Sequence, residues 1–179
     1  VEGPVADPSG SLAIGYDGGG LFGHAVDRIG AEAKLSERLV SVEDLTVISP
    51  AGELHADGWV DLTAAFADGL GSPPSDLGSL AYGLNLMVTR TDLALLVRGE
   101  GGMAGSVRGM VSVSGRGVDP ETAEAKGEVS LSASGLDATG VARPVDAELT
   151  ASGGLAEGVA RLSALDLTAG GAGGGVTLS

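Results

Sequence analysis

The stretch ELHADGWVDL, residues 53–62, decides the fold class because its side chains alternate strictly in character. Leu54, Ala56, Gly58, Val60 and Leu62 form one set, and acidic residues, a histidine and a tryptophan form the other. Successive side chains of a β-strand point to opposite faces, so a period of two predicts a strand with one apolar and one wet face. Antiparallel sheets that are exposed on one side have this pattern, whereas buried parallel strands are apolar throughout.

The same alternation recurs along the rest of the chain. Residues 106–114, 123–133 and 145–151 each alternate small or aliphatic side chains with hydroxyl or charged ones. Turn-forming sequences such as DGGG (17–20) and SPAG (49–52) lie between the runs. We therefore predict an all-β chain that forms an elongated, curved, antiparallel-rich sheet, a gutter with one apolar concave face. The alternative is a β-sandwich or β-solenoid, in which apolar faces close on each other.

Three segments carry more specific predictions. Residues 84–88 and 93–97 are interpreted as the two arms of a hairpin that turns near residues 90–92. The helical spacing of apolar residues at 62–70 allows one short helix over 63–70, within an irregular or helical insertion at about 61–79. Residues 1–179 otherwise form a single β-repeat segment, which we interpret as a piece of a longer protein.

Two segments resemble each other. Residues 38–47 (RLVSVEDLTV) and 160–169 (ARLSALDLTA) share an apolar-x-x-Leu-x-apolar core, and each is followed by a glycine turn and a new run. Weak self-similarity of this kind is typical of stacked strand units in which each neighbour covers the next.

The apolar members of the alternating runs are the candidate residues for lining a groove that binds an apolar client. They are Leu54, Ala56, Val60, Leu62, Leu84, Leu86, Val88, Leu93, Leu95, Val97, Val107, Val111, Val113, Val129, Leu131, Val145, Leu149, Leu165 and Leu167.

Composition excludes several classes of protein. The chain has 10 basic and 24 acidic residues, a formal charge of −14, so a nucleic-acid backbone would be repelled. No apolar run approaches the roughly 18 residues of a membrane helix. Cysteine is absent, which removes disulfides, thiol chemistry and Cys-ligated zinc.

No catalytic residue, metal ligand or cofactor site is predicted. The two histidines, His24 and His55, are far apart in the sequence, and no serine lies in a nucleophile motif with suitable partners. Calcium-loop spacings are missing, and aromatic residues, 3% of the chain, are too few for a sugar-binding cleft. We expect a non-enzymatic protein. Trp59 is unusual on a polar face, and the alternatives are a cap on a sheet end or a contact with a neighbouring domain.

Residues 42–62, 105–115 and 119–131 resemble the repeats of the TamB (translocation and assembly module) family and of the related AsmA-like proteins. The shared rhythm is a Gly-x-apolar-x-Gly-x-apolar strand followed by a second glycine-containing alternating strand, and it covers most of residues 34–179. The resemblance implies a long gutter-shaped sheet, anchored at the inner membrane, that crosses the periplasm. It also implies carriage of phospholipid or another apolar client, and an outer-membrane assembly partner, in the bacterial cell envelope.

Two functional hypotheses follow. In the first, the segment is part of a conduit whose apolar groove carries phospholipid, or strands of outer-membrane proteins, between the two membranes. In the second, it is a structural β-repeat module of an adhesin or surface protein whose apolar faces are filled by the protein itself. The inward positions are rich in glycine and alanine, which favours an incompletely filled interior and therefore the conduit.

Overall fold

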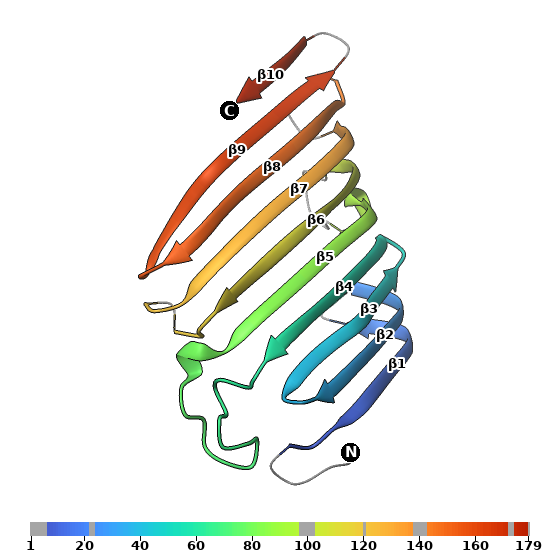
Figure 1. Cartoon of the computed structure of the whole chain (residues 1–179). Coiled ribbons are helices and arrows are strands. Elements are labelled where there is room, and N and C mark those ends of the chain that lie inside the picture. Colours follow the sequence, from blue (N-terminus) through green and yellow to red (C-terminus); the bar gives the residue numbers. More distant parts are fainter. Residues whose placement is uncertain are drawn as a thin grey trace.

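A single antiparallel sheet of ten strands makes up nearly the whole molecule (Figure 1). The structure is a computed structural model that describes residues 7–21, 24–96, 103–119, 121–137, 143–171 and 174–178. The strands are β1 (Gly10–Leu21), β2 (His24–Ser36), β3 (Leu39–Ser49), β4 (Gly52–Asp61), β5 (Ala81–Asp92), β6 (Ala104–Arg116), β7 (Glu124–Asp137), β8 (Val145–Ala156), β9 (Val159–Gly171) and β10 (Gly174–Leu178). Two short helical turns, η1 (Leu77–Ser79) and α1 (Leu93–Leu96), flank β5.

The strand order is the sequence order, so each strand pairs with its neighbours in the chain and β1 and β10 form the two edges. The sheet is open, elongated and curved, which confirms the predicted fold class. The sandwich and solenoid alternatives are wrong, because all ten strands belong to one sheet and no second sheet covers it among the described residues.

The predicted hairpin over residues 84–97 is wrong. Residues 81–92 form one strand, β5, that pairs with β4 as far as Thr91 and with β6 as far as Asp92. The Asp92 carboxylate then accepts a hydrogen bond of 2.9 Å from the Ala94 amide, which favours a helical turn at this point. Leu93 and Leu95 consequently lie in α1 and not in a strand. Val97 lies outside the described residues.

The short helix predicted at residues 63–70 is also wrong, because the segment between β4 and β5 consists of turns and η1. The Asp61 carboxylate accepts a hydrogen bond of 2.8 Å from the Thr63 amide, and Gly69 has a φ of 98°. The Asp61 carboxylate could begin a helix as Asp92 does, but only one helical bond follows, from the Phe66 amide to the Leu62 carbonyl. The left-handed Gly69 then bonds back to the Phe66 carbonyl, so the chain turns before a second helical turn forms.

Arg38, in the turn between β2 and β3, holds this segment against the sheet. Its Nη1 donates to the carbonyls of Phe66 and Ala67 at 2.9 and 3.0 Å, and its Nη2 donates to Asp7 at 3.2 Å. The hydrogen bond from Arg38 lowers the pKa of the Asp7 carboxyl below its ordinary value of 3.8. A lowered folded-state pKa means that this pair supports the fold at neutral pH and loses its effect as acid protonates Asp7.

The curvature coincides with one extra residue in alternate strands. The register shifts show an insertion in β3 between Val42 and Leu45, in β5 at residues 89–90, in β7 at residues 134–135 and in β9 at Ser163. A β-bulge bends the strand that carries it and increases the local twist. All four bulged strands run in the same direction, so their effects add along the sheet.

Glycines on the apolar face permit close approach of neighbouring strands. A Cβ at Gly58 would lie 2.7 Å from the Gly83 carbonyl oxygen of β5, and one at Gly153 would lie 2.6 Å from the Arg161 carbonyl oxygen of β9. Both separations are shorter than a carbon–oxygen contact allows, so a side chain at either position would force the strands apart. Gly127 is on the same face but has room, because its nearest neighbour would be the Ser112 carbonyl oxygen at 3.6 Å.

We therefore expect Gly58→Ala to lower the free energy of unfolding by about 1–3 kcal/mol through local overpacking. Gly127→Ala should be neutral or stabilise by up to about 1 kcal/mol, because alanine restricts the unfolded chain. Urea unfolding of the two variants measures the difference. Equal stabilities would show that strand proximity at Gly58 does not shape the sheet.

Candidate functional site

The pairing register brings most apolar side chains of the ten strands onto one face, which we call the apolar face; Ile48, Met87 and Met110 are exceptions on the other side. Residues that face each other across an antiparallel pair lie on the same side of the sheet. One row of such partners crosses the entire sheet and contains only apolar residues, one tyrosine and one glycine. The row is Tyr16, Ile29, Val47, Leu54, Val88, Gly109, Leu131, Leu149, Leu167 and Leu178.

The next row toward the β2–β3 turn crosses β1 to β9 and is entirely aliphatic. In order it is Ile14, Ala31, Leu45, Ala56, Leu86, Val111, Val129, Ala151 and Leu165. Large and small side chains alternate along much of it. Two further rows on the same side become rich in glycine and alanine between β6 and β8, at Gly115, Ala125, Gly127 and Gly153.

The structure places the predicted groove residues that lie within strands on this face. They are Leu54, Ala56, Val60, Leu84, Leu86, Val88, Val107, Val111, Val113, Val129, Leu131, Val145, Leu149, Leu165 and Leu167. Leu62 directly follows β4 and is half-buried at its end. Leu93 and Leu95 belong to α1 and not to the rows, which corrects their assignment as strand residues.

The prediction missed the part of the face that β1, β2 and β3 contribute, together with Tyr82, Leu155 and Leu162. The signal in β2 was present, because Ile29, Ala31, Ala33 and Leu35 alternate with glycine and charged residues. In β3 and β9 the bulges interrupt the period of two, so a search for strict alternation passes over them.

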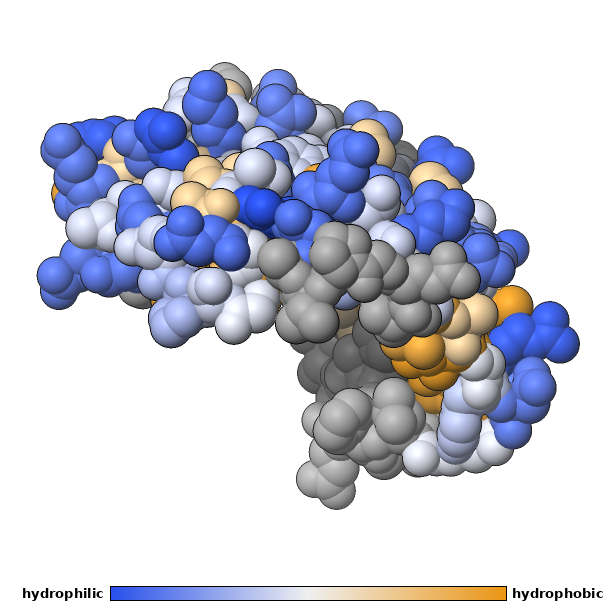
Figure 2. All heavy atoms as spheres, turned by 60° about the horizontal axis from the view of Figure 1, so that its bottom comes forward, coloured by the Kyte–Doolittle hydropathy of each residue, from blue (hydrophilic) through white to orange (hydrophobic). Residues whose placement is uncertain are grey.

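The apolar face is left uncovered by the described residues. The hydrophobic residues that are truly buried are few and mostly small, namely Val26, Ala56, Ala65 and Ala123. Leu84 on β5 is 50% exposed, and Leu162 on β9 is 66% exposed. Figure 2 shows the molecule as an arch with a mostly hydrophilic outer surface, and hydrophobic side chains gather on the inner side at one end of it. Chemically, such a surface can bind aliphatic chains but offers them little specific recognition.

The opposite side, the polar face, carries Trp59. A Cβ at Gly83 would lie 2.6 Å from the Trp59 Nε1, so the indole lies across this glycine on the neighbouring strand β5. The side chain covers a backbone that has no side chain of its own, as aromatic residues do over glycines in sheets. Trp59 also forms one wall of a hollow of about 310 Å³ that Lys126 and Glu128 line as well.

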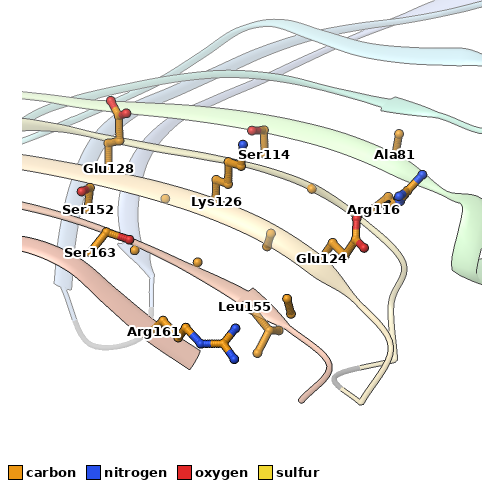
Figure 3. A pocket seen from close by; sticks show the side chains of 16 residues that line it. Ala81, Ser114, Arg116, Glu124, Lys126, Glu128, Ser152, Leu155, Arg161 and Ser163 are labelled. Atoms are coloured by element: carbon orange, nitrogen blue, oxygen red, sulfur yellow. Dashed lines mark hydrogen bonds and ion pairs between the residues drawn. The ribbon is translucent and has the colours of Figure 1, made fainter. Parts of the chain in front are cut away.

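Another hollow lies on the polar face, over β6 to β9 (Figure 3). Its volume is about 780 Å³, and side chains of Arg116, Glu124, Lys126, Glu128 and Arg161 line it. Nothing in the alternation of the sequence predicts this site, because the register alone brings β6 and β9 residues onto the same part of the face.

His55 contacts only a carboxylate and a hydroxyl group among the described residues. His55 Nε2 lies 3.0 Å from Glu53, and its Nδ1 lies 3.0 Å from the Thr46 hydroxyl. The described part of the chain contains no group of three or more His, Cys, Asp or Glu side chains that could hold a metal ion.

No family model, curated protein or solved structure matches the chain. In the described residues, no helix has the length and apolar character needed to span a membrane.

The position of Trp59 predicts a spectroscopic change. Gly83→Ala would push the indole off the strand into water, because the new Cβ and Nε1 cannot both occupy their places. We expect the emission maximum of this single tryptophan to shift to longer wavelength, with the far-UV spectrum unchanged. Gly127→Ala is the control and should leave the emission unaltered. An unshifted emission maximum in Gly83→Ala would contradict the packing of Trp59 on β5.

Proposed function

We propose that this chain is a non-enzymatic segment of a periplasmic envelope protein that carries phospholipid between the inner and outer membranes. The client lies on the apolar face, and strands of outer-membrane proteins are a second client of the same chemistry. The single observation that supports this proposal is the largely apolar row that crosses ten strands and that the described part of the chain leaves uncovered.

The dimensions of the sheet suit a path along which an acyl chain can move. Ten strands at a spacing of about 4.8 Å extend roughly 43 Å from the first to the last. Each methylene that leaves water for the apolar face gains about 0.8 kcal/mol. The aliphatic rows repeat much the same surface at every strand, so an acyl chain that moves from one strand to the next exchanges similar contacts. Similar contacts give no single deep binding position, which favours movement along the sheet.

The scarcity of aromatic residues supports the same proposal. A closed core over a sheet of this size would be filled by large side chains, because protein interiors are close-packed. On this face the largest common residues are leucine and valine, and alanine or glycine lies between them. The space that remains is open to a client.

A structural β-repeat module of an adhesin or surface protein is the second candidate. The observation that favours it is the pair of open edges, where Leu12 of β1 is 59% exposed and Val176 of β10 is 70% exposed. Exposed edge strands with apolar side chains pair readily with further strands. In such a module the apolar face would be covered by other protein and would carry no lipid.

Val129→Asp distinguishes the two candidates. Val129 lies in the middle of the aliphatic row, between Val111 of β6 and Ala151 of β8. On an open face the new carboxylate stays hydrated, so thermal unfolding should change little, but the charge interrupts the apolar track. We expect the purified variant to lose co-purifying phospholipid, as measured by mass spectrometry of its lipid extract.

Ser130→Asp is the matched control, because it places the same charge one residue along β7 on the polar face. It should retain both the fold and the lipid. Phospholipid bound to Val129→Asp at the wild-type level would refute the conduit at this site. Outright unfolding of Val129→Asp would instead indicate a covered face, since a buried unpaired carboxylate costs several kcal/mol.

A further inference from the structure

Two cationic side chains, Lys126 and Arg161, line the 780 Å³ hollow on the polar face (Figure 3). The Lys126 side chain extends toward Ser114 and the Arg161 side chain toward Leu155, so a shared ligand requires both to turn toward each other. Lys126 of β7 is the register partner of Gly154 of β8, and Gly154 is the register partner of Arg161 of β9. The two cationic side chains therefore start from the same face, two strands apart, on either side of a residue without a side chain. Two strand spacings are about 9.6 Å, which leaves room for one tetrahedral oxyanion between an ammonium and a guanidinium group.

Neither cation is neutralised within the described structure. Arg28, Lys34, Arg38 and Arg116 each form an ion pair with a carboxylate. Lys126 and Arg161 form none with any described residue, although the chain carries a formal charge of −14. Arg90, Arg108 and Arg143 also form no ion pair with a described residue, but they do not line this hollow. What distinguishes Lys126 and Arg161 is that both line the same hollow.

The remaining lining fits an oxyanion. Ser114, Ser152 and Ser163 contribute hydroxyl groups to the same hollow. The Glu124 carboxylate is paired with Arg116 at 2.9 Å, which leaves Glu128 as the one lining carboxylate without an ion pair in the described structure. The charged residues around the hollow thus comprise three cations and two carboxylates, a local excess of positive charge within an acidic protein.

We propose that this hollow binds a phosphate group, held between Lys126 and Arg161 over Gly154, with hydroxyl donors from Ser152 and Ser163. The group is presented either by a soluble phosphate or by the headgroup of a phospholipid at a membrane surface. This site is on the face opposite the apolar rows and is independent of the proposed carriage of apolar clients.

The test is a titration of the isotopically labelled protein with sodium phosphate, against sodium chloride at matched ionic strength, followed by amide chemical shifts. Saturable shifts that centre on Gly154 are expected. Lys126→Gln combined with Arg161→Gln should weaken phosphate binding by about tenfold or more, because two charge-assisted hydrogen bonds are lost. Glu128→Gln should strengthen binding, since it removes the opposing carboxylate.

The control removes two cations elsewhere, with Arg90→Gln combined with Arg108→Gln, neither of which lines the hollow. This variant should bind phosphate as the wild type does. Equal weakening in both double variants, or shifts that do not saturate, would overturn the proposal.

Sedimentation with vesicles of phosphatidylglycerol or of phosphatidylcholine then identifies whether the phosphate group comes from a lipid headgroup or from a soluble ligand. Loss of vesicle binding in the Lys126/Arg161 variant indicates a headgroup, and phosphate binding without vesicle association indicates a soluble ligand.

Discussion

The constraint on which the rest of the structure depends is that one face of a ten-stranded sheet must stay apolar from edge to edge. Side chains in a strand alternate between faces, so a single inserted residue moves every later side chain to the opposite side. The sheet nevertheless bulges in β3, β5, β7 and β9. In β3 the apolar series passes from Val42 to Leu45, and in β9 it passes from Leu162 to Leu165. In each of these two bulges, two polar or small residues separate successive apolar residues, where a regular strand has one. The extra residue occupies the bulge, so the next apolar side chain again points to the apolar face.

This arrangement explains how a curved sheet is stable with so little buried core. The described residues that are fully shielded are small, and most aliphatic side chains on the apolar face are half-buried by their cross-strand neighbours. The backbone hydrogen bonds between strands and the contacts between cross-strand side chains must therefore supply most of the stability. Glycines such as Gly58 and Gly153 let adjacent strands come closer on this side than side chains would permit. The aliphatic surface that remains exposed is the surface from which a bound apolar chain would exclude water.

Much of the fold could be predicted from the sequence, because alternation survives wherever strands are regular. The strands around residues 53–62 and 123–133 are examples. The similarity between segments 38–47 and 160–169, which the sequence analysis interpreted as a sign of stacked strand units, reflects a shared β-bulge. The two segments are the bulged strands β3 and β9, and their shared apolar-x-x-Leu-x-apolar core marks the bulge.

The errors arose where a side-chain hydrogen bond, local in one case and tertiary in the other, overrode the hydrophobic pattern. Leu93 and Leu95 alternate as strand residues do, yet the Asp92 carboxylate begins a helical turn. The apolar residues of 62–70 have helical spacing. Arg38, which lies in the turn between β2 and β3, nevertheless donates hydrogen bonds to the carbonyls of Phe66 and Ala67. The cationic pair around Gly154 depends on register across three strands, which no local pattern reveals.

The central claim, that the apolar face is open and takes an apolar client, is tested most directly by cysteine reactivity, since the chain has no cysteine of its own. Val129→Cys places a thiol on the apolar face and Ser130→Cys places one on the polar face of the same strand. Both should react with a water-soluble maleimide in the lipid-free folded protein. Added phospholipid should protect the thiol at position 129 and leave the one at position 130 reactive. A thiol at position 129 that reacts only after unfolding, or that lipid does not protect, would contradict the account.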